Sequence, residues 1–185
     1  FMYNKGIMGS PWVGLDNFRY ILHYKDFWIA FRNTIVISIG RLIFGFPAPI
    51  ILALLLNELR SQKFKKIVQS VLYLPYFLSW IIVFGIVFNL LSVTSGVLAK
   101  VLMQYFGARQ TAILGNPDYF RPLIYITAIW KGAGWGTIIY LAAIAGINPE
   151  LYESAIIDGA NRFKQCLYIT LPSLKYAILI LLILD

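Results

Sequence analysis

The stretch IVQSVLYLPYFLSWIIVFGIVFNLL, residues 67–91, contains no charged side chain. Two more long apolar blocks flank it: residues 34–56, where Arg41 is the only charge, and residues 122–147, where Lys131 is the only charge. A helix needs roughly 20 residues to cross about 30 Å of hydrocarbon. Each block is long enough, so we predict an all-α protein, a polytopic transmembrane helical bundle.

The overall composition agrees with this prediction. Hydrophobic residues make up 59% of the 185 positions and charged residues 13%, whereas a soluble domain is about a quarter charged. The net charge of +8 raises the alternative of a nucleic-acid partner. Basic residues cluster directly after an apolar block, as the positive-inside rule predicts, at Arg60, Lys63, Lys65 and Lys66. We therefore expect membrane lipid, and no nucleic acid, around this chain.

The basic cluster also predicts the orientation of the chain. It places residues 58–66 in the cytoplasm, although the four basic residues within 1–32 favour the opposite orientation. Residues 1–32 are then an external interfacial segment, 92–120 an external loop and 148–173 a cytoplasmic loop. The transmembrane domain covers residues 33–185, with spans at about 33–57, 67–91 and 121–147 and a partial span at 174–185. We expect the intact protein to continue on both sides, so that this chain is truncated at both ends.

Two charges lie inside predicted spans, where ionisable side chains are costly. Lys131 and Arg41 either have a structural role, with stems that extend toward the interface, or line a pathway through the bundle. Three prolines are expected to bend the spans: Pro47, Pro49 and Pro75.

A run of small residues occupies the third span. Gly132, Gly134 and Gly136 do not have the spacing of a dinucleotide-binding loop, and no strand precedes them. Gly132 with Gly136, and Ala142 with Gly146, have instead the small-xxx-small spacing that lets membrane helices pack closely.

The sequence contains no catalytic constellation. One histidine, His23, and one cysteine, Cys166, do not make a zinc site or a disulfide framework. No phosphate-binding loop of the Walker type occurs. We predict no catalytic residue, no metal and no cofactor, and expect that this is not an enzyme.

Residues 148–173 have the signals of two short helices joined by a turn. Asn148 is suited to cap a helix that begins at Pro149, and Gly159 is suited to end it. Its apolar stripe is expected at Leu151, Tyr152, Ala155 and Ile156. A second helix is expected over 161–169. This element either rests on lipid or is a docking site for a cytoplasmic partner.

The same segment resembles the EAA loop of bacterial ABC importer permeases, in which Glu-Ala-Ala, Gly, Ile and Leu-Pro recur at fixed spacing. Every spacing matches, and Ser154 in place of the second alanine is the one departure. The matching positions are Glu153, Ser154, Ala155, Gly159, Ile169, Leu171 and Pro172.

Other segments resemble a narrower group, the carbohydrate-uptake permeases. Residues 13–18 (VGLDNF) and 72–75 (LYLP) are similar to motifs of that group. Residues 130–136 (WKGAGWG) with 140–143 (YLAA) are similar to the LplB-like permeases of complex polysaccharides and oligosaccharides. The resemblance extends over nearly the whole chain.

The resemblance implies a six-span fold of the ABC importer permease type, of which the first span and most of the last two are outside this chain. It implies a bacterial cytoplasmic membrane location and carbohydrate import. The implied partners are cytoplasmic ATP-hydrolysing subunits, a second homologous permease subunit and an extracytoplasmic solute-binding protein. Residues 149–169 would be the helices that couple the permease to the ATPase.

Three alternatives stay open. In the first, the cargo is a non-sugar solute such as an amino acid, a peptide or phosphate. In the second, the chain is a membrane scaffold or sensor subunit without transport. A secondary transporter is the third alternative, but it would carry no EAA loop.

Overall fold

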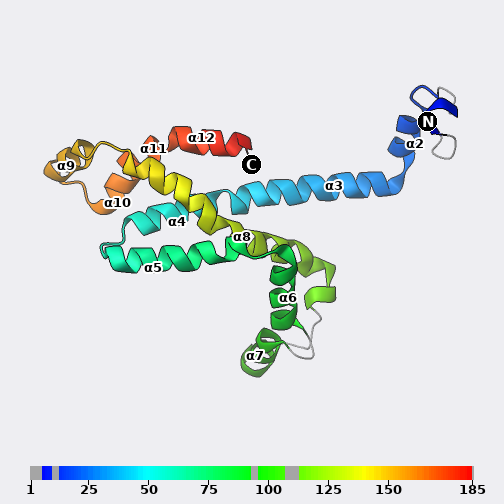
Figure 1. Cartoon of the computed structure of the whole chain (residues 1–185), viewed down its shortest axis with the longest axis horizontal. Coiled ribbons are helices and arrows are strands. Elements are labelled where there is room, and N and C mark those ends of the chain that lie inside the picture. The colour runs from blue at the N-terminus through cyan, green and yellow to red at the C-terminus, as the bar shows by residue number, and fades with distance from the viewer. Residues whose placement is uncertain (1–5, 10–12, 93–95, 107–112, 185) are drawn as a thin grey trace. The chain divides into compact units, whose positions relative to one another are not determined.

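The computed structural model describes residues 6–9, 13–92, 96–106 and 113–184, and these residues form helices and loops without any strand. The prediction of an all-α fold is confirmed. The chain divides into two compact units, residues 1–39 and 40–185, each of which is described by itself. Figure 1 shows the order of the helices along the chain.

The first unit contains α1 (Gly6–Gly9), α2 (Asp16–His23) and most of α3 (Lys25–Gly40). No residue of α2 is buried, and its aromatic rings contact neighbours along the chain, as in the stacked pair Tyr20 and Tyr24. The indole nitrogen of Trp28 donates a hydrogen bond to the Leu22 carbonyl at 2.7 Å, which joins the end of α2 to α3. Helix α3 begins eight residues before the expected start of the first span at 33.

The second unit is arranged around α8 (Pro117–Ala145). Helix α8 packs against the π-turn η2 (Arg41–Gly45), α4 (Pro47–Asn57), α5 (Gln62–Tyr73) and the 3-10 turn η3 (Leu74–Phe77). The core of the unit consists of Ala53, Tyr140, Ile144 and Leu174. Helix α8 therefore carries the contacts that position η2, α4, α5 and η3 in this unit.

The charge-free stretch 67–91 is not one straight helix. Helix α5 passes into η3, and α6 (Trp80–Leu91) then leaves at 103°. Pro75 supplies no N–H to continue the helix, and Leu78 is extended with ψ 137°. The hydroxyl of Ser79 accepts a hydrogen bond from Ile82 N at 3.3 Å and caps α6. The bend expected at Pro75 is therefore present.

Pro47 and Pro49 lie in the first turn of α4, where proline is tolerated. The π-turn η2 comes directly before them, and the Phe46 N–H bonds the Arg41 carbonyl at 3.3 Å. Lys25–Asn57 is nevertheless one continuous helical stretch, so the sharp bend present at Pro75 has no counterpart at Pro47 or Pro49.

Among the described residues, two stretches are long and apolar enough to cross a membrane, Lys25–Asn57 and Pro117–Ala145. Two bent pairs of helices bring this number to four if each pair is one span. They are 62–77 with 80–91, and 162–173 with 175–184. The four expected spans overlap these stretches in sequence, while their number and their boundaries in the bilayer stay predictions.

Two of the segments outside the expected spans, 92–120 and 148–173, are also helical in part. The predicted external loop contains α7 (Val97–Phe106) and the 3-10 turn η4 (Ile113–Gly115). Residues 93–95 and 107–112 of that loop lie outside the described residues. The predicted cytoplasmic loop contains α9 (Glu150–Ile157), α10 (Arg162–Gln165), the π-turn η5 (Cys166–Thr170) and α11 (Leu171–Ser173), and α12 (Lys175–Leu184) follows it.

Candidate functional site

The helix α9 begins as the sequence predicts, within one residue. The side-chain oxygen of Asn148 accepts a hydrogen bond from Glu150 N at 3.1 Å, and its amide donates to the Glu150 carboxylate at 3.1 Å. Pro149 occupies the cap position, and its carbonyl accepts from Tyr152 N at 2.9 Å. Glu150 and Glu153 lie in the first turn, where the helix dipole favours negative charge.

Gly159 ends α9 in a Schellman motif. Its φ is +77°, a left-handed conformation that other L-residues rarely adopt. Its N–H bonds the Ile156 carbonyl at 3.0 Å, and Ala160 N bonds the Ala155 carbonyl at 2.8 Å. A Cβ at this position would meet no atom within 4 Å, so the need for glycine comes from the backbone angle and not from crowding.

The second helix of the loop, α10, is capped by Asn161, two residues after Gly159. The side chain of Asn161 accepts a hydrogen bond from Lys164 N at 2.9 Å. The side chain of Gln165 is buried and donates to the Ala160 carbonyl at 2.9 Å, which ties the turn to the helix that follows. The helix then continues through η5 and α11 as far as Ser173. Leu171 and Pro172 thus lie inside a helix that is longer than the 161–169 expected.

The predicted apolar stripe divides into two parts. Leu151 and Ile156 are 47% and 60% exposed. Ala155 is half-buried, and Tyr152 is half-buried with its hydroxyl 2.9 Å from the Thr170 hydroxyl. The stripe therefore presents two side chains outward, while Tyr152 contacts its own chain.

The remaining positions of the EAA pattern fall into two groups. Glu153, Ser154 and Pro172 are exposed, and Ile169 and Leu171 are half-buried. Sequence reasoning missed four exposed apolar side chains of the same loop: Ile157 at 86%, Phe163 at 74%, Leu167 at 43% and Tyr168 at 72%. The signal available for Phe163 was its position between two basic residues, Arg162 and Lys164.

Lys131 lies on α8 and bonds the bend between α5 and α6. Its Nζ donates to the Tyr76 carbonyl at 2.6 Å, and it lies 5.4 Å from the centre of the Tyr76 ring and 5.5 Å from that of Trp80. The Tyr76 ring stacks on Trp135 with centroids 4.6 Å apart. A carbonyl left free by a broken helix is costly in a membrane, and the ammonium satisfies it. This contact supports a structural role for Lys131.

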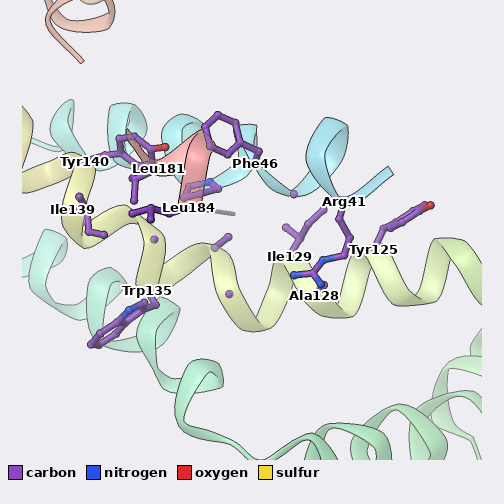
Figure 2. Close-up of a pocket in the computed structure, with 15 residues that line it drawn as sticks. Arg41, Phe46, Tyr125, Ala128, Ile129, Trp135, Ile139, Tyr140, Leu181 and Leu184 are labelled. Carbon is purple, nitrogen blue, oxygen red and sulfur yellow. The ribbon is translucent and has the colours of Figure 1, made fainter. Parts of the chain in front are cut away.

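Arg41 lies elsewhere, at the edge of a cavity of about 290 Å³ between η2, α4, α8 and α12. Figure 2 shows its side chain extending toward α8 beside Ala128 and Ile129. The other lining residues are mostly apolar: Gly45, Phe46, Pro49, Tyr125, Gly132, Ala133, Trp135, Gly136, Ile139, Tyr140, Leu181 and Leu184. The structure does not bring Arg41 and Lys131 to one site.

Cys166 is half-buried in the π-turn η5. Burial raises the pKa of its thiol above the ordinary value, and the negative charge of Glu58 raises this pKa further. The thiol is therefore protonated at neutral pH. Within the described ranges, no three His, Cys, Asp or Glu side chains come together in a way suited to a metal ion.

The sequence profile of the binding-protein-dependent transport system inner membrane components matches residues 45–185, which include both the α8 bundle and the capped loop at 148–173. This chain belongs to that family. It is thus a component of the inner membrane, in a family of transport subunits and not of enzymes.

Similar curated proteins agree with this membership. The polygalacturonan/rhamnogalacturonan transport system permease protein YteP of Bacillus subtilis strain 168 is 47% identical over 179 residues, which are 97% of this chain and 56% of that protein. Protein LplB of the same strain is 46% identical over 97% of this chain and 56% of its own length. This chain spans about half the length of the curated relatives it matches.

Solved structures share the fold as well. A chain in the crystal structure of a bacterial ABC transporter involved in the import of the acidic polysaccharide alginate matches 100% of this chain and 66% of its own length, with 41% identity and a TM-score of 0.91. A second structure of an alginate ABC transporter, in complex with an alginate pentasaccharide-bound periplasmic protein, matches with 40% identity and a TM-score of 0.91, over 100% of this chain and 65% of its own. This chain therefore has the all-α fold of ABC importer permeases.

Proposed function

We propose that the protein is the transmembrane permease subunit of an ABC importer that moves an oligosaccharide or a fragment of a polysaccharide into the cell. The observation that carries this proposal is the loop at 148–173. There the complete EAA spacing coincides with a helix–turn–helix whose turn requires glycine and which exposes several large apolar side chains.

The loop has the properties of a docking surface. Leu151, Ile156, Ile157 and Phe163 expose large apolar side chains on an element that is capped at both helix starts. Short rigid helices that present apolar side chains suit a helix-in-groove contact. We propose that a cytoplasmic ATP-hydrolysing subunit supplies the groove, and that Glu153 meets a polar or basic group at its edge.

The proposal includes two more partners. A second, homologous permease subunit would complete the pathway through the membrane. An extracytoplasmic solute-binding protein would deliver the cargo on the other side. The alginate transporter in complex with a sugar-bound periplasmic protein supports that assembly.

Carbohydrate is the proposed cargo class because both the curated relatives and the solved structures point to polysaccharide-derived sugars. ATP-driven closure of the ATPase would displace the loop, and the spans would move as rigid bodies between outward-open and inward-open arrangements. In this mechanism Lys131 keeps the α5–α6 bend attached to α8 while the helices move.

The test is affinity purification of the full-length protein from its native membrane, together with an uptake assay. The substitution Gly159→Asp adds a negative charge and a strained backbone angle to the turn. It is expected to lower recovery of the ATPase and uptake of labelled polygalacturonan and alginate oligosaccharides at least about tenfold, a loss of roughly 1.4 kcal/mol of docking free energy.

The matched control is Gly159→Asn, which has nearly the same shape, carries no charge and tolerates the left-handed conformation better. It is expected to retain most of the ATPase. Full ATPase recovery and uptake in the Gly159→Asp protein would contradict the proposal. A wild-type protein that retains the ATPase but accumulates no solute would be a scaffold or sensor, and one that accumulates only a non-sugar solute would correct the cargo.

A further inference from the structure

Two hydroxyl groups connect the two helices of the loop across 18 residues. The Tyr152 hydroxyl on α9 lies 2.9 Å from the Thr170 hydroxyl at the end of η5. Thr170 is 2% exposed and Tyr152 is half-buried, so water does not compete strongly for this contact. A hydrogen bond in such surroundings is stronger than the same bond in water.

The surroundings of Thr170 indicate the direction of this bond. The Thr170 hydroxyl also lies 3.5 Å from the Gln165 carbonyl, to which it donates. The lone pairs of the Thr170 oxygen can then accept a hydrogen bond from the Tyr152 hydroxyl. The π-turn η5 brings Thr170 to the side of the helix that faces α9, because the extra residue in the turn changes the register of the side chains.

Thr170 is linked in turn to the bundle. Its carbonyl accepts a hydrogen bond from Leu174 N at 3.2 Å. Leu174 is fully buried against Ala53 of α4 and against Tyr140 and Ile144 of α8. A displacement that reaches Thr170 therefore reaches the packed core one helical turn further along.

The connection between α9 and the second helix is otherwise a tight turn. The turn is closed by its two Schellman hydrogen bonds, and a Cβ at Gly159 would meet no atom within 4 Å, so no other side chain packs against that position. The Gln165 side chain holds only the end of this turn, at Ala160. The Tyr152–Thr170 pair adds a side-chain contact that bridges this turn from one helix to the other.

We infer that the Tyr152–Thr170 hydroxyl pair fixes the angle between α9 and the helix at 162–173, so that a movement of α9 is transmitted to α12 and the bundle. The inference rests on the proposed function, and it goes beyond docking to transmission. Tyr152 is then a positioning residue, because its hydroxyl holds α9 in place against the helix at 162–173.

The experiment uses the full-length permease with its ATPase, partner permease and binding protein in proteoliposomes. Uptake of whichever polygalacturonan or alginate oligosaccharide the wild type accumulates is measured beside ATP hydrolysis. Tyr152→Phe removes one oxygen and keeps the ring. It is expected to lower the amount of sugar moved per ATP about fivefold, the equilibrium change that corresponds to one typical hydrogen bond, while ATPase recovery is unchanged.

The chain offers matched controls. Tyr168→Phe removes a hydroxyl that is exposed on the same loop, and it is expected to behave like wild type. Thr170→Val should reproduce the Tyr152→Phe effect, and Thr170→Ser should retain coupling because it keeps the hydroxyl. The double variant Tyr152→Phe/Thr170→Val should be no worse than either single variant, since all three lose the same bond.

Each outcome decides the inference. An unchanged ratio of sugar to ATP in Tyr152→Phe, or additive losses in the double variant, overturns it. Loss of the ATPase from the Tyr152→Phe complex also overturns it, because the hydroxyl would then serve docking. If the wild-type complex neither retains an ATPase nor accumulates sugar, the proposed function itself fails.

Discussion

At the scale of residues, three glycines with the same spacing have three different surroundings. Gly134 lies against the Leu72 backbone carbonyl of α5, and a Cβ there would collide with it. A Cβ at Gly136 would lie 2.9 Å from the Pro49 side chain of α4. Gly132 borders the cavity, and a Cβ there would meet no atom within 4 Å. Close packing was predicted for Gly132 with Gly136 and for Gly146. The close packing is confirmed at Gly136 but not at Gly132 or Gly146, and the close packing at Gly134 was not predicted.

This difference predicts opposite effects of one substitution. Gly134→Ala should destabilise the protein by about 1–3 kcal/mol, because α5 and α8 must separate. Gly132→Ala should be neutral or stabilising by up to about 1 kcal/mol, since alanine favours the helix. Thermal unfolding of the two purified variants in detergent checks this, and equal melting temperatures would contradict the close contact at Leu72.

The raised pKa of Cys166 predicts slow reaction with thiol reagents at neutral pH, since the thiolate is the nucleophile. The rate of alkylation should increase as the pH rises above the ordinary thiol range. Glu58→Gln removes the second cause of the shift, lowers the pKa and should accelerate alkylation at pH 8. Rates followed by mass spectrometry check this, and Glu153→Gln is the control because Glu153 does not affect the thiol.

At the scale of elements, the α5–η3–α6 bend depends on a partner from another helix. The turn ends with a Leu78 N to Pro75 carbonyl bond at 3.2 Å, while the Tyr76 carbonyl is bonded by Lys131, 55 residues away. The rings of Tyr76 and Trp80 surround the same ammonium, an arrangement that favours a cation. A charge inside a predicted span is thus explained by a break in a neighbouring span.

Substitution of Lys131 tests this explanation. Lys131→Met keeps the length of the side chain but leaves the Tyr76 carbonyl without its donor, and it should cost about 1–2 kcal/mol. For a chain of this size that corresponds to a decrease in melting temperature of roughly 2–8 °C. Lys131→Arg retains the charge and should lose less stability than Lys131→Met. If Lys131→Met is as stable as the wild type, the lysine has no structural role here, and a role in the pathway is favoured instead.

At the scale of the whole molecule, the proposed function depends on which side of the membrane each loop lies. The basic cluster at 60–66 and the loop at 148–173 should lie on the cytoplasmic side, and residues 113–120 on the other side. Glu58, two residues before the basic cluster, is near enough to raise the pKa of Cys166 in the loop at 148–173, which agrees with these two segments lying on one side.

Cysteine labelling tests the sidedness. In a full-length protein with Cys166→Ser, a cysteine introduced at Lys65 or Asp158 should react with a membrane-impermeant maleimide only after the cells are opened. A cysteine at Asn116 should react in intact cells. Labelling of Lys65→Cys from outside would reverse the topology and would remove the loop at 148–173 from the reach of an ATPase.

Local features of this protein were determined by its sequence alone. The apolar blocks, the caps at Asn148 and Asn161, the glycine that ends α9 and the EAA spacing are properties of neighbouring residues, and the structure contains each of them. The helical class and the family followed from these signals, because helix capping and hydrophobic length depend on contacts within a few residues.

Contacts between distant residues were decided only by the tertiary structure. The partner of Lys131, the surroundings of the three glycines and the inward turn of Tyr152 toward Thr170 depend on which helix lies opposite. A single sequence cannot reveal these, because the same lysine, glycine or tyrosine satisfies its local helix equally well in every packing. The free energy that separates the packings comes from the neighbour that the fold brings into contact.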